Sequence, residues 1–116
     1  MSEPQFTSLH DLRRFPLADG VSARALFGDG AMLSLVELAP NALLPEHSHP
    51  HEQLGVVLRG ELQMLVADEP HVLKEMDAYT LPGGVEHEAR AGAQGALVLD
   101  VFQPVREDFR DPAAGR

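Results

Sequence analysis

Three of the six histidines in this chain stand within five residues, in the stretch PEHSHPHEQLG that covers residues 45–55. Side chains alternate between the two faces of a β-strand, so a strand here would project His47 and His49 from the same face. A neutral imidazole is the commonest protein ligand for divalent transition metals, and two of them on one face can bind a single ion. The spacing therefore predicts that His47 and His49 are metal ligands.

Two residues outside this pair complete a ligand set. Gln53 follows His49 by four residues and offers an amide oxygen. His87 ends the stretch LPGGVEH, residues 81–87, where a Pro-Gly corner can turn it back toward the same face. We therefore expect three imidazoles and one oxygen around one divalent transition metal. Ni, Zn, Mn, Co and Fe all suit such a set.

The neighbours of the histidine pair compete for the same role. Glu52 is the alternative fourth ligand, but strand alternation places Gln53 on one face and Glu52 on the other, which favours Gln53. Pro50 cannot donate a hydrogen bond to a sheet and is expected to interrupt the alternation. We therefore assign His51 to the surroundings of the site or to the surface.

Composition excludes several classes of function. The 116 residues contain no cysteine, which excludes disulfides, thiolate nucleophiles and zinc-thiolate sites. The formal charge of -9 repels nucleic-acid phosphates and anionic membranes and favours a bound cation. No apolar run approaches the roughly 20 residues that cross a bilayer. The N-terminal sequence lacks the pattern of a secretory signal, so a cytoplasmic location is expected.

The elements that must position these residues are strands. Short runs rich in Val and Leu recur about every ten residues and are separated by turn residues, which predicts an all-β sandwich or barrel with antiparallel neighbours. The predicted turns cover 59–60, 68–70, 82–84 and 92–95. A helical turn is expected at 9–14 and a frayed tail at 110–116. The predicted strands cover residues 31–38, 53–58, 62–67, 71–73, 79–81 and 96–102.

The spacing of these residues resembles the two sequence motifs of the cupin superfamily. The first motif is His47-x-His49-x3-Gln53-x6-Gly60, and the second is Pro82-x-Gly84-x2-His87. The match spans about residues 41 to 91. It implies a small cupin β-barrel, a double-stranded β-helix or jelly roll, in which three His and one carboxylate hold a metal near the axis. We expect one such domain over residues 1–116, with a barrel core at about 21–106 and a short N-terminal arm.

The sequence departs from the family pattern at four positions. Gln53 stands at the carboxylate position, and Ala91 replaces an Asn that follows the last histidine by four residues. Asn41 and Met76 replace glycines that precede His47 and Pro82 by six residues. Asn41 can still adopt a left-handed turn, because Asn tolerates this conformation better than most residues.

A second stretch points to one group of cupins. The run HSHPHEQ, followed by the C-terminal DVFQPVREDF, resembles the KdgF family of small cupins from pectin and alginate breakdown. In that family an Asp, a Phe two residues later and an Arg four residues beyond act at the site, and they match Asp100, Phe102 and Arg106. The resemblance implies a metal-dependent isomerase that converts 4,5-unsaturated uronate monosaccharides to linear keto sugars.

Alternation within ALVLDVF, residues 96–102, agrees with these roles. It places Val98, Asp100 and Phe102 on one face, so an acid stands on an otherwise apolar surface, where a charge is costly unless it is used. Asp100 could relay protons, Phe102 could pack on the sugar, and Arg106 could bind its carboxylate. The alternatives are an Asp at a strand end, an ordinary core Phe and an Arg paired with Glu107 or Asp108.

The sequence leaves other functions open and also predicts an assembly. A cupin dioxygenase would use a similar ligand set, and a sugar-binding or sensory cupin would bind a sugar acid without turnover. A homodimer is expected, because a short barrel with an apolar outer sheet often pairs with a copy of itself. The residues considered for the seam between the two copies are Val56, Leu58, Leu62 and Met64.

Overall fold

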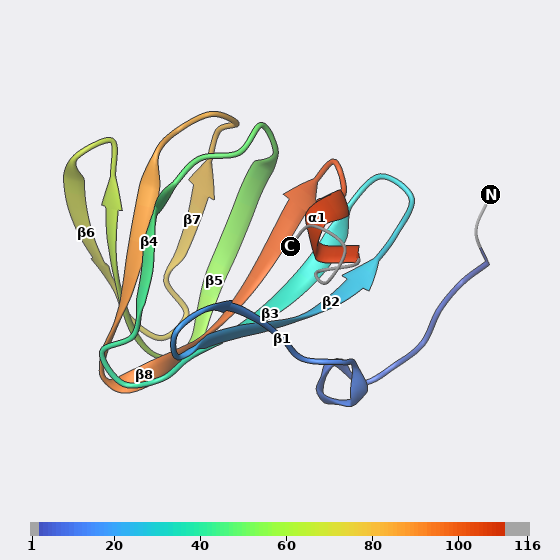
Figure 1. Ribbon diagram of the computed structural model, residues 1–116, viewed down its shortest axis with the longest axis horizontal. Helices are drawn as coiled ribbons and strands as arrows, with labels where there is room; N and C mark the ends of the chain where they lie inside the picture. Colours follow the sequence, from blue (N-terminus) through green and yellow to red (C-terminus); the bar gives the residue numbers. More distant parts are fainter. Residues whose placement is uncertain (1–2, 111–116) are drawn as a thin grey trace.

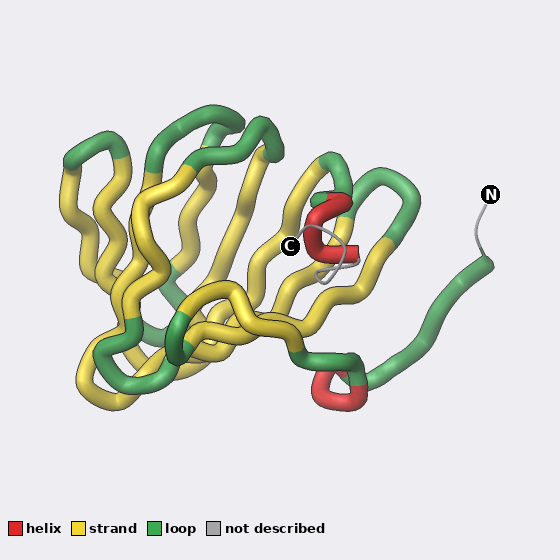
Figure 2. The backbone as a smooth tube through the Cα atoms, viewed as in Figure 1, coloured by secondary structure: helices red, strands yellow, loops and turns green. Residues whose placement is uncertain are grey.

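The computed structural model describes residues 3–110, and antiparallel strands dominate them (Figures 1 and 2). A 3-10 turn, η1 (Leu9–Asp11), precedes the strands, and a single-turn helix, α1 (Glu107–Arg110), follows them. The predicted helical turn at 9–14 is thus shorter, and residues 111–116 of the predicted tail lie outside the described residues. The strands are β1 (Phe15–Ala18), β2 (Val21–Phe27), β3 (Met32–Leu38), β4 (Leu43–His47), β5 (Glu52–Val66), β6 (Glu69–Leu73), β7 (Ala78–Leu81) and β8 (His87–Gln103).

All strand pairings are antiparallel and belong to one curled sheet. The order is β1-β2-β3-β8-β5-β6, with β4 on β8 and β7 on β5. The long strands β5 and β8 run side by side and join the β4, β6 and β7 side of the molecule to the β1, β2 and β3 side (Figure 1). This arrangement confirms the all-β prediction. β1 lies before the predicted core start at residue 21 and pairs with β2.

Two of the predicted turns are wrong. Residues 59–60 and 92–95 lie inside β5 and β8, and the register between the two strands shifts at 57–59 and 60–62. Gly60 and Gly95 have φ of 82° and 79°. A glycine at positive φ serves a tight turn and a β-bulge equally well, because both need a conformation that other residues avoid. Here the glycines bend two continuous strands.

The other two predicted turns are present. The β5–β6 turn uses Ala67 and Asp68, both at positive φ, and lies one residue before the predicted start of 68–70. The turn after β7 uses Gly83 and Gly84, within the predicted 82–84. Strands β1, β2 and β4 were not predicted, because each mixes polar or proline residues with its apolar ones.

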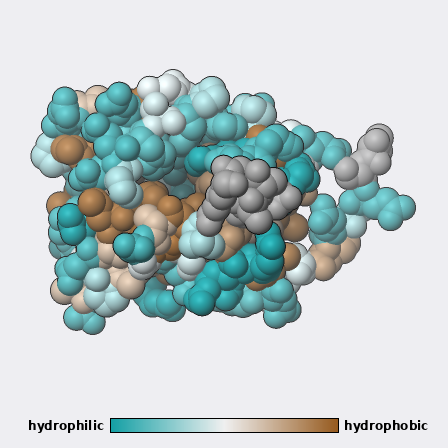
Figure 3. Space-filling model, viewed as in Figure 1, coloured by the Kyte–Doolittle hydropathy of each residue, from teal (hydrophilic) through white to brown (hydrophobic). Residues whose placement is uncertain are grey.

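Alternation along β5 and β8 builds much of the core. Val57, Leu62 and Val98 are at most 2% exposed, whereas the residues directly before and after each of them are more exposed. At the barrel's end, Phe109 of α1 packs edge-on against Phe15, with ring centroids 5.3 Å apart. On the face drawn in Figure 3, hydrophobic residues gather in the middle and hydrophilic residues surround them. None of the helices in residues 3–110 has the length and apolar character needed to cross a membrane.

Both positions at which this chain lacks the family's glycines have left-handed backbone. Asn41 has φ of 61° and Met76 has φ of 70°. Asn41 therefore adopts the conformation expected for it. Met76 is 71% exposed, so its side chain contributes little packing to compensate for the strained backbone.

Replacement of this methionine is expected to stabilise the protein. Glycine adopts positive φ without steric cost, so the substitution removes the backbone strain at this position. The free energy gained should exceed the extra chain entropy that glycine loses on folding. Met76→Gly should therefore raise the free energy of unfolding by up to about 1 kcal/mol. Denaturant unfolding measures the change. The matched control is Val72→Gly. Val72 is an exposed apolar residue of β6 whose φ is not positive, so this variant should lose about 0.5–1 kcal/mol of unfolding free energy. Equal destabilisation by both variants would contradict the prediction.

Candidate active site

Three imidazoles meet at one end of the barrel. The ring nitrogens available as ligands on His47, His49 and His87 all lie within 4.8 Å of one another. His47 is the last residue of β4 and pairs with His87, the first residue of β8. Pairing between two strands 40 residues apart thus brings two of the three histidines together.

His49 reaches the site from a loop, so the prediction that a strand carries both His47 and His49 is wrong. β4 ends at His47, and the chain bends through residues 48–51 before β5 begins. The carbonyl of His49 accepts a hydrogen bond of 2.8 Å from the backbone N–H of Gly84. The Pro-Gly-Gly corner therefore positions the His49 loop as well as His87.

Hydrogen bonds orient all three rings in the same way. In each ring Nδ1 lies within hydrogen-bond distance of a backbone carbonyl, which can only accept, so Nδ1 carries the proton and Nε2 keeps a free lone pair. Nε2 of His87 is buried and has no hydrogen-bond partner among the described residues. Three inward lone pairs, one of them unpartnered, fit a bound metal ion. The contacts are His47 to Pro45 O (2.8 Å), His49 to His51 O (3.1 Å) and His87 to Val85 O (3.0 Å).

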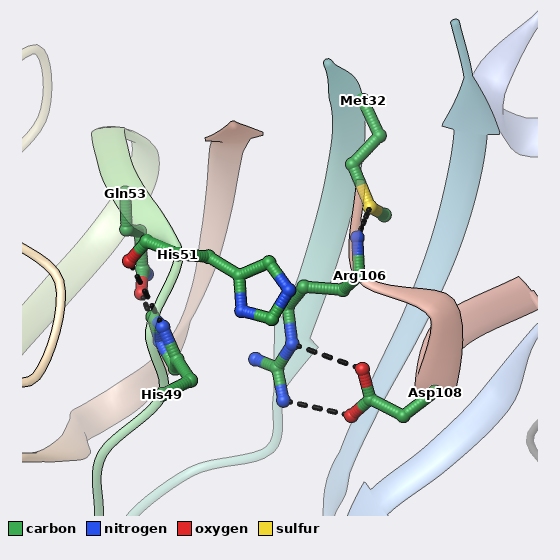
Figure 4. A network of polar contacts seen from close by, with 6 residues as sticks. All are labelled: Met32, His49, His51, Gln53, Arg106 and Asp108. Atoms are coloured by element: carbon green, nitrogen blue, oxygen red, sulfur yellow. Dashed lines mark hydrogen bonds and ion pairs between the residues drawn. The ribbon is translucent and has the colours of Figure 1, made fainter. Parts of the chain in front are cut away.

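Gln53 adds an oxygen to this group. Its side chain is buried, whereas Glu52 is exposed, as strand alternation predicts. Oε1 of Gln53 lies 3.0 Å from Nε2 of His49 (Figure 4). Given the tautomer of His49, both atoms present lone pairs, and a shared cation would remove their repulsion. His51 is absent from the group, but its carbonyl orients His49.

Burial favours the neutral form of two of the imidazoles, those of His49 and His87. Burial and, to a smaller extent, the positive charge of Arg106 together lower the pKa of His49 to about 4. Burial likewise lowers the pKa of His87. The neutral form is the one that binds metals, so these shifts favour ligation over protonation.

A buried carboxyl lies beside the histidines. Asp100 of β8 is 6% exposed, and its neighbours Leu99 and Val101 face the other side of the sheet. Burial raises the pKa of Asp100 to about 6, while hydrogen bonds from Tyr79 and Gln53 and the charge of Arg106 oppose the rise. A carboxyl with this pKa can accept and donate protons near neutral pH.

The Gln53 amide connects the two groups. Its Oε1 points to His49, so its NH2 group is the donor in the hydrogen bond with Asp100. A glutamate at this position could not donate that bond and would place a second negative charge beside Asp100. The amide therefore suits a site that needs both an oxygen ligand and an adjacent acid.

Arg106 and Phe102 lie at the edge of this site. Phe102 is 3% exposed, and its ring stacks edge-on with His49 at 5.5 Å. The guanidinium of Arg106 lies 5.1 Å from the centre of that ring and 4.2 Å from that of Phe109. It also donates two hydrogen bonds to Asp108, of 2.9 and 3.3 Å (Figure 4). Phe102 is thus a core residue that also lines the site.

Two neighbouring spaces adjoin these residues. An inner cavity of about 40 Å³ is lined by side chains that include His87, Asp100 and Phe102. One water needs about 10–15 Å³ by the same measure, so this cavity holds a few waters. An outer groove of about 440 Å³ shares His47 and Arg106 with it. The outer groove therefore adjoins the inner cavity at these two side chains.

Comparison with known proteins identifies the family. Residues 34–102 match the family model described as "Cupin domain". This chain is a cupin. It is 30% identical over 95 residues to the pectin degradation protein KdgF of Dickeya dadantii, a match that covers 80% of this cupin and 86% of that protein.

Solved structures agree with this assignment. The cupin superposes on KdgF from Halomonas sp. with a TM-score of 0.85 and 26% identity, covering 92% of this chain and 99% of that one. An RmlC-like cupin from Shewanella frigidimarina gives a TM-score of 0.84 and 27% identity, with 92% and 96% coverage. The resemblance to cupins and to KdgF is therefore confirmed.

Two residues of the cupin's site escaped sequence reasoning. Tyr79 donates a hydrogen bond of 2.5 Å to Oδ1 of Asp100. Phe109 contacts both Phe102 and Arg106. The sequence offered a reason to consider Tyr79, because it is the only tyrosine of the chain and stands on a predicted strand. It offered none for Phe109, since nothing local indicates that α1 folds back over the barrel.

Proposed function

We propose that this cupin converts 4,5-unsaturated uronate monosaccharides to linear keto sugars with one bound divalent transition metal. The observation that carries the proposal is a buried acid, Asp100, beside three imidazoles whose free lone pairs converge. The similarity to the pectin degradation protein KdgF supports a role in pectin degradation. His47, His49, Gln53 and His87 would hold the metal.

The reaction needs proton movement and no oxidant. The substrate is a cyclic hemiacetal with a double bond between C4 and C5. Asp100 accepts the proton of the hemiacetal hydroxyl while the bond between C1 and the ring oxygen breaks, which yields an aldehyde at C1 and an enolate at C5. Asp100 then returns the proton to C4, and the enolate becomes a ketone. A carboxyl with a pKa near 6 suits both steps.

The remaining residues bind and orient the sugar. When bound, the metal would act as a Lewis acid toward the sugar's oxygens, and the neutral Gln53 leaves it more positive than a carboxylate ligand would. Arg106 can bind the uronate carboxylate through two parallel hydrogen bonds, the geometry that it now makes with Asp108. Small-molecule sites usually span about 300 Å³ or more, so the sugar ring would lie in the outer groove and extend its hemiacetal end into the inner cavity, which Asp100 lines.

The test uses the unsaturated uronates themselves. Metal-loaded protein should speed the loss of the ultraviolet band of the conjugated C4–C5 double bond well beyond the spontaneous rate. Protein stripped with a chelator is the control and should not. If metal-loaded protein leaves the loss of this band at the spontaneous rate with both galacturonate- and mannuronate-derived substrates, the proposal is rejected. Oxygen consumption by iron-loaded protein would instead favour a dioxygenase.

The proposed assembly is a homodimer through the outer face of β5, β7 and β8. Leu62 and Met64 cannot form the seam, because they are 2% and 4% exposed in the core. The outer face instead presents apolar side chains around a shallow groove, and Leu54 there is 41% exposed. An apolar sheet face of this kind is stabilised by covering it.

Light scattering tests this assembly. The wild-type protein should show about twice the 12.6 kDa of one chain at micromolar concentration. Leu54→Asp should reduce the mass to that of a single chain, because it places a charge in the seam. The matched control Val72→Asp alters an exposed apolar residue of β6 and should leave the dimer intact. A wild-type mass of 12.6 kDa would exclude the dimer.

A further inference from the structure

Four inward-facing residues form one row across neighbouring strands. Tyr79 of β7 stands opposite Gly55 of β5, Gly55 stands opposite Asp100 of β8, and Asp100 stands opposite Ser34 of β3. Asp100 and Ser34 are 6% and 0% exposed. The row therefore runs across four neighbouring strands beside the histidines. It places the hydroxyl-bearing residues Tyr79 and Ser34 on opposite sides of the Asp100 carboxyl.

The glycine is what allows the tyrosine to reach the acid. The Tyr79 hydroxyl passes over Gly55 to donate its hydrogen bond to Oδ1 of Asp100. A methyl group added at Gly55 would overlap Cζ and the hydroxyl of Tyr79 and also Oδ1 of Asp100. Glycine weakens a strand interior, and close approach of other groups is a common reason for its presence there.

We propose that Tyr79 is a positioning residue that fixes the Asp100 carboxyl through Oδ1, and that Gly55 provides the space this contact needs. The terminal torsion of an Asp side chain is broad and roughly two-fold, so an unrestrained carboxyl would present either oxygen at many angles. The Tyr79 hydroxyl holds Oδ1 and, together with the Gln53 amide that also donates to Asp100, sets the direction in which the carboxyl exchanges its proton. This inference rests on the proposed role of Asp100 in proton transfer.

Tyr79 itself reports the contact. The chain has one tyrosine and no tryptophan, so its ultraviolet emission comes from Tyr79 alone. A carboxylate that accepts a hydrogen bond from an excited phenol takes up its proton and quenches the emission. At neutral pH, Asp100→Asn should therefore brighten the emission and shift the tyrosine absorption band. Ser34→Ala, on the other side of Asp100, should leave both unchanged. Emission that is equal in wild type and Asp100→Asn would overturn the proposal.

Turnover of unsaturated uronate supplies the second measurement. Tyr79→Phe keeps the ring and removes only the hydroxyl, so kcat should fall about ten- to a hundred-fold with little change in KM, because the acid is misplaced while substrate contacts remain. Gly55→Ala should give a similar loss by displacing both partners. Thr80→Val removes an outward hydroxyl from the same strand and should retain wild-type kcat. Circular dichroism and metal content verify that each variant is folded and loaded.

The two measurements separate this inference from the proposed function. If the wild-type protein consumes unsaturated uronate and the folded Tyr79→Phe variant has the same kcat, the positioning role of Tyr79 is overturned. The proposed function then still stands. If the wild-type protein does not consume uronate, the proposed function fails. The emission of Asp100→Asn then decides alone whether Tyr79 fixes the carboxyl.

Discussion

Asp100→Asn should retain its fold and metal yet lose about a hundred- to ten-thousand-fold in turnover, the usual contribution of a general acid-base group. The amide is nearly isosteric with the carboxyl and can still accept the Tyr79 hydrogen bond at Oδ1. It cannot exchange a proton near neutral pH, as a carboxyl with a pKa of about 6 can. Loss of the double-bond absorbance should then slow toward the spontaneous rate.

The choice of control for this variant follows from the structure. Asp108 is a nearby acid, but its carboxylate pairs with Arg106, so Asp108→Asn would disturb the site and is unsuitable as a control. Asp68 is exposed in the β5–β6 turn at positive φ, where Asn is well tolerated. Asp68→Asn should therefore keep wild-type turnover. Metal-replete Asp100→Asn that works at the wild-type rate would remove Asp100 from the mechanism.

The second large effect is expected from His87→Ala, which should lower metal affinity by more than a hundredfold. Loss of a residue that merely supports a ligand typically costs about 10- to 100-fold, so loss of a ligand should cost more. Elemental analysis after dialysis should find about one divalent ion per chain in the wild type and almost none in the variant. Turnover should fall in parallel.

Two further variants make the metal prediction decisive. His87 is buried, so its replacement also leaves a cavity that could destabilise the fold. His47 is only half-buried, and His47→Ala should lose the metal with less effect on stability. Glu52→Ala is the matched control, because Glu52 precedes Gln53 but faces solvent, and it should keep its metal. Full metal content in both histidine variants would refute the ligand assignment.

The sequence by itself determined the residue types of the candidate site and the faces of its strands. Alternation placed Gln53 and Asp100 inward from neighbouring residues alone, because the side-chain period of a strand is fixed at two. Motif spacing added His87 and the Pro-Gly corner that precedes it. These are local properties, and local geometry sufficed to predict them.

Only the tertiary structure decided which glycines bend strands and which residues meet. Gly60 and Gly95 carry the signal of a turn, yet the partner strand makes each a bend in a continuous strand. The contact of Tyr79 with Asp100 depends on the register of β7 and β8 against β5. Register depends on how the whole barrel closes, and a shift of one residue would turn these side chains to the other face.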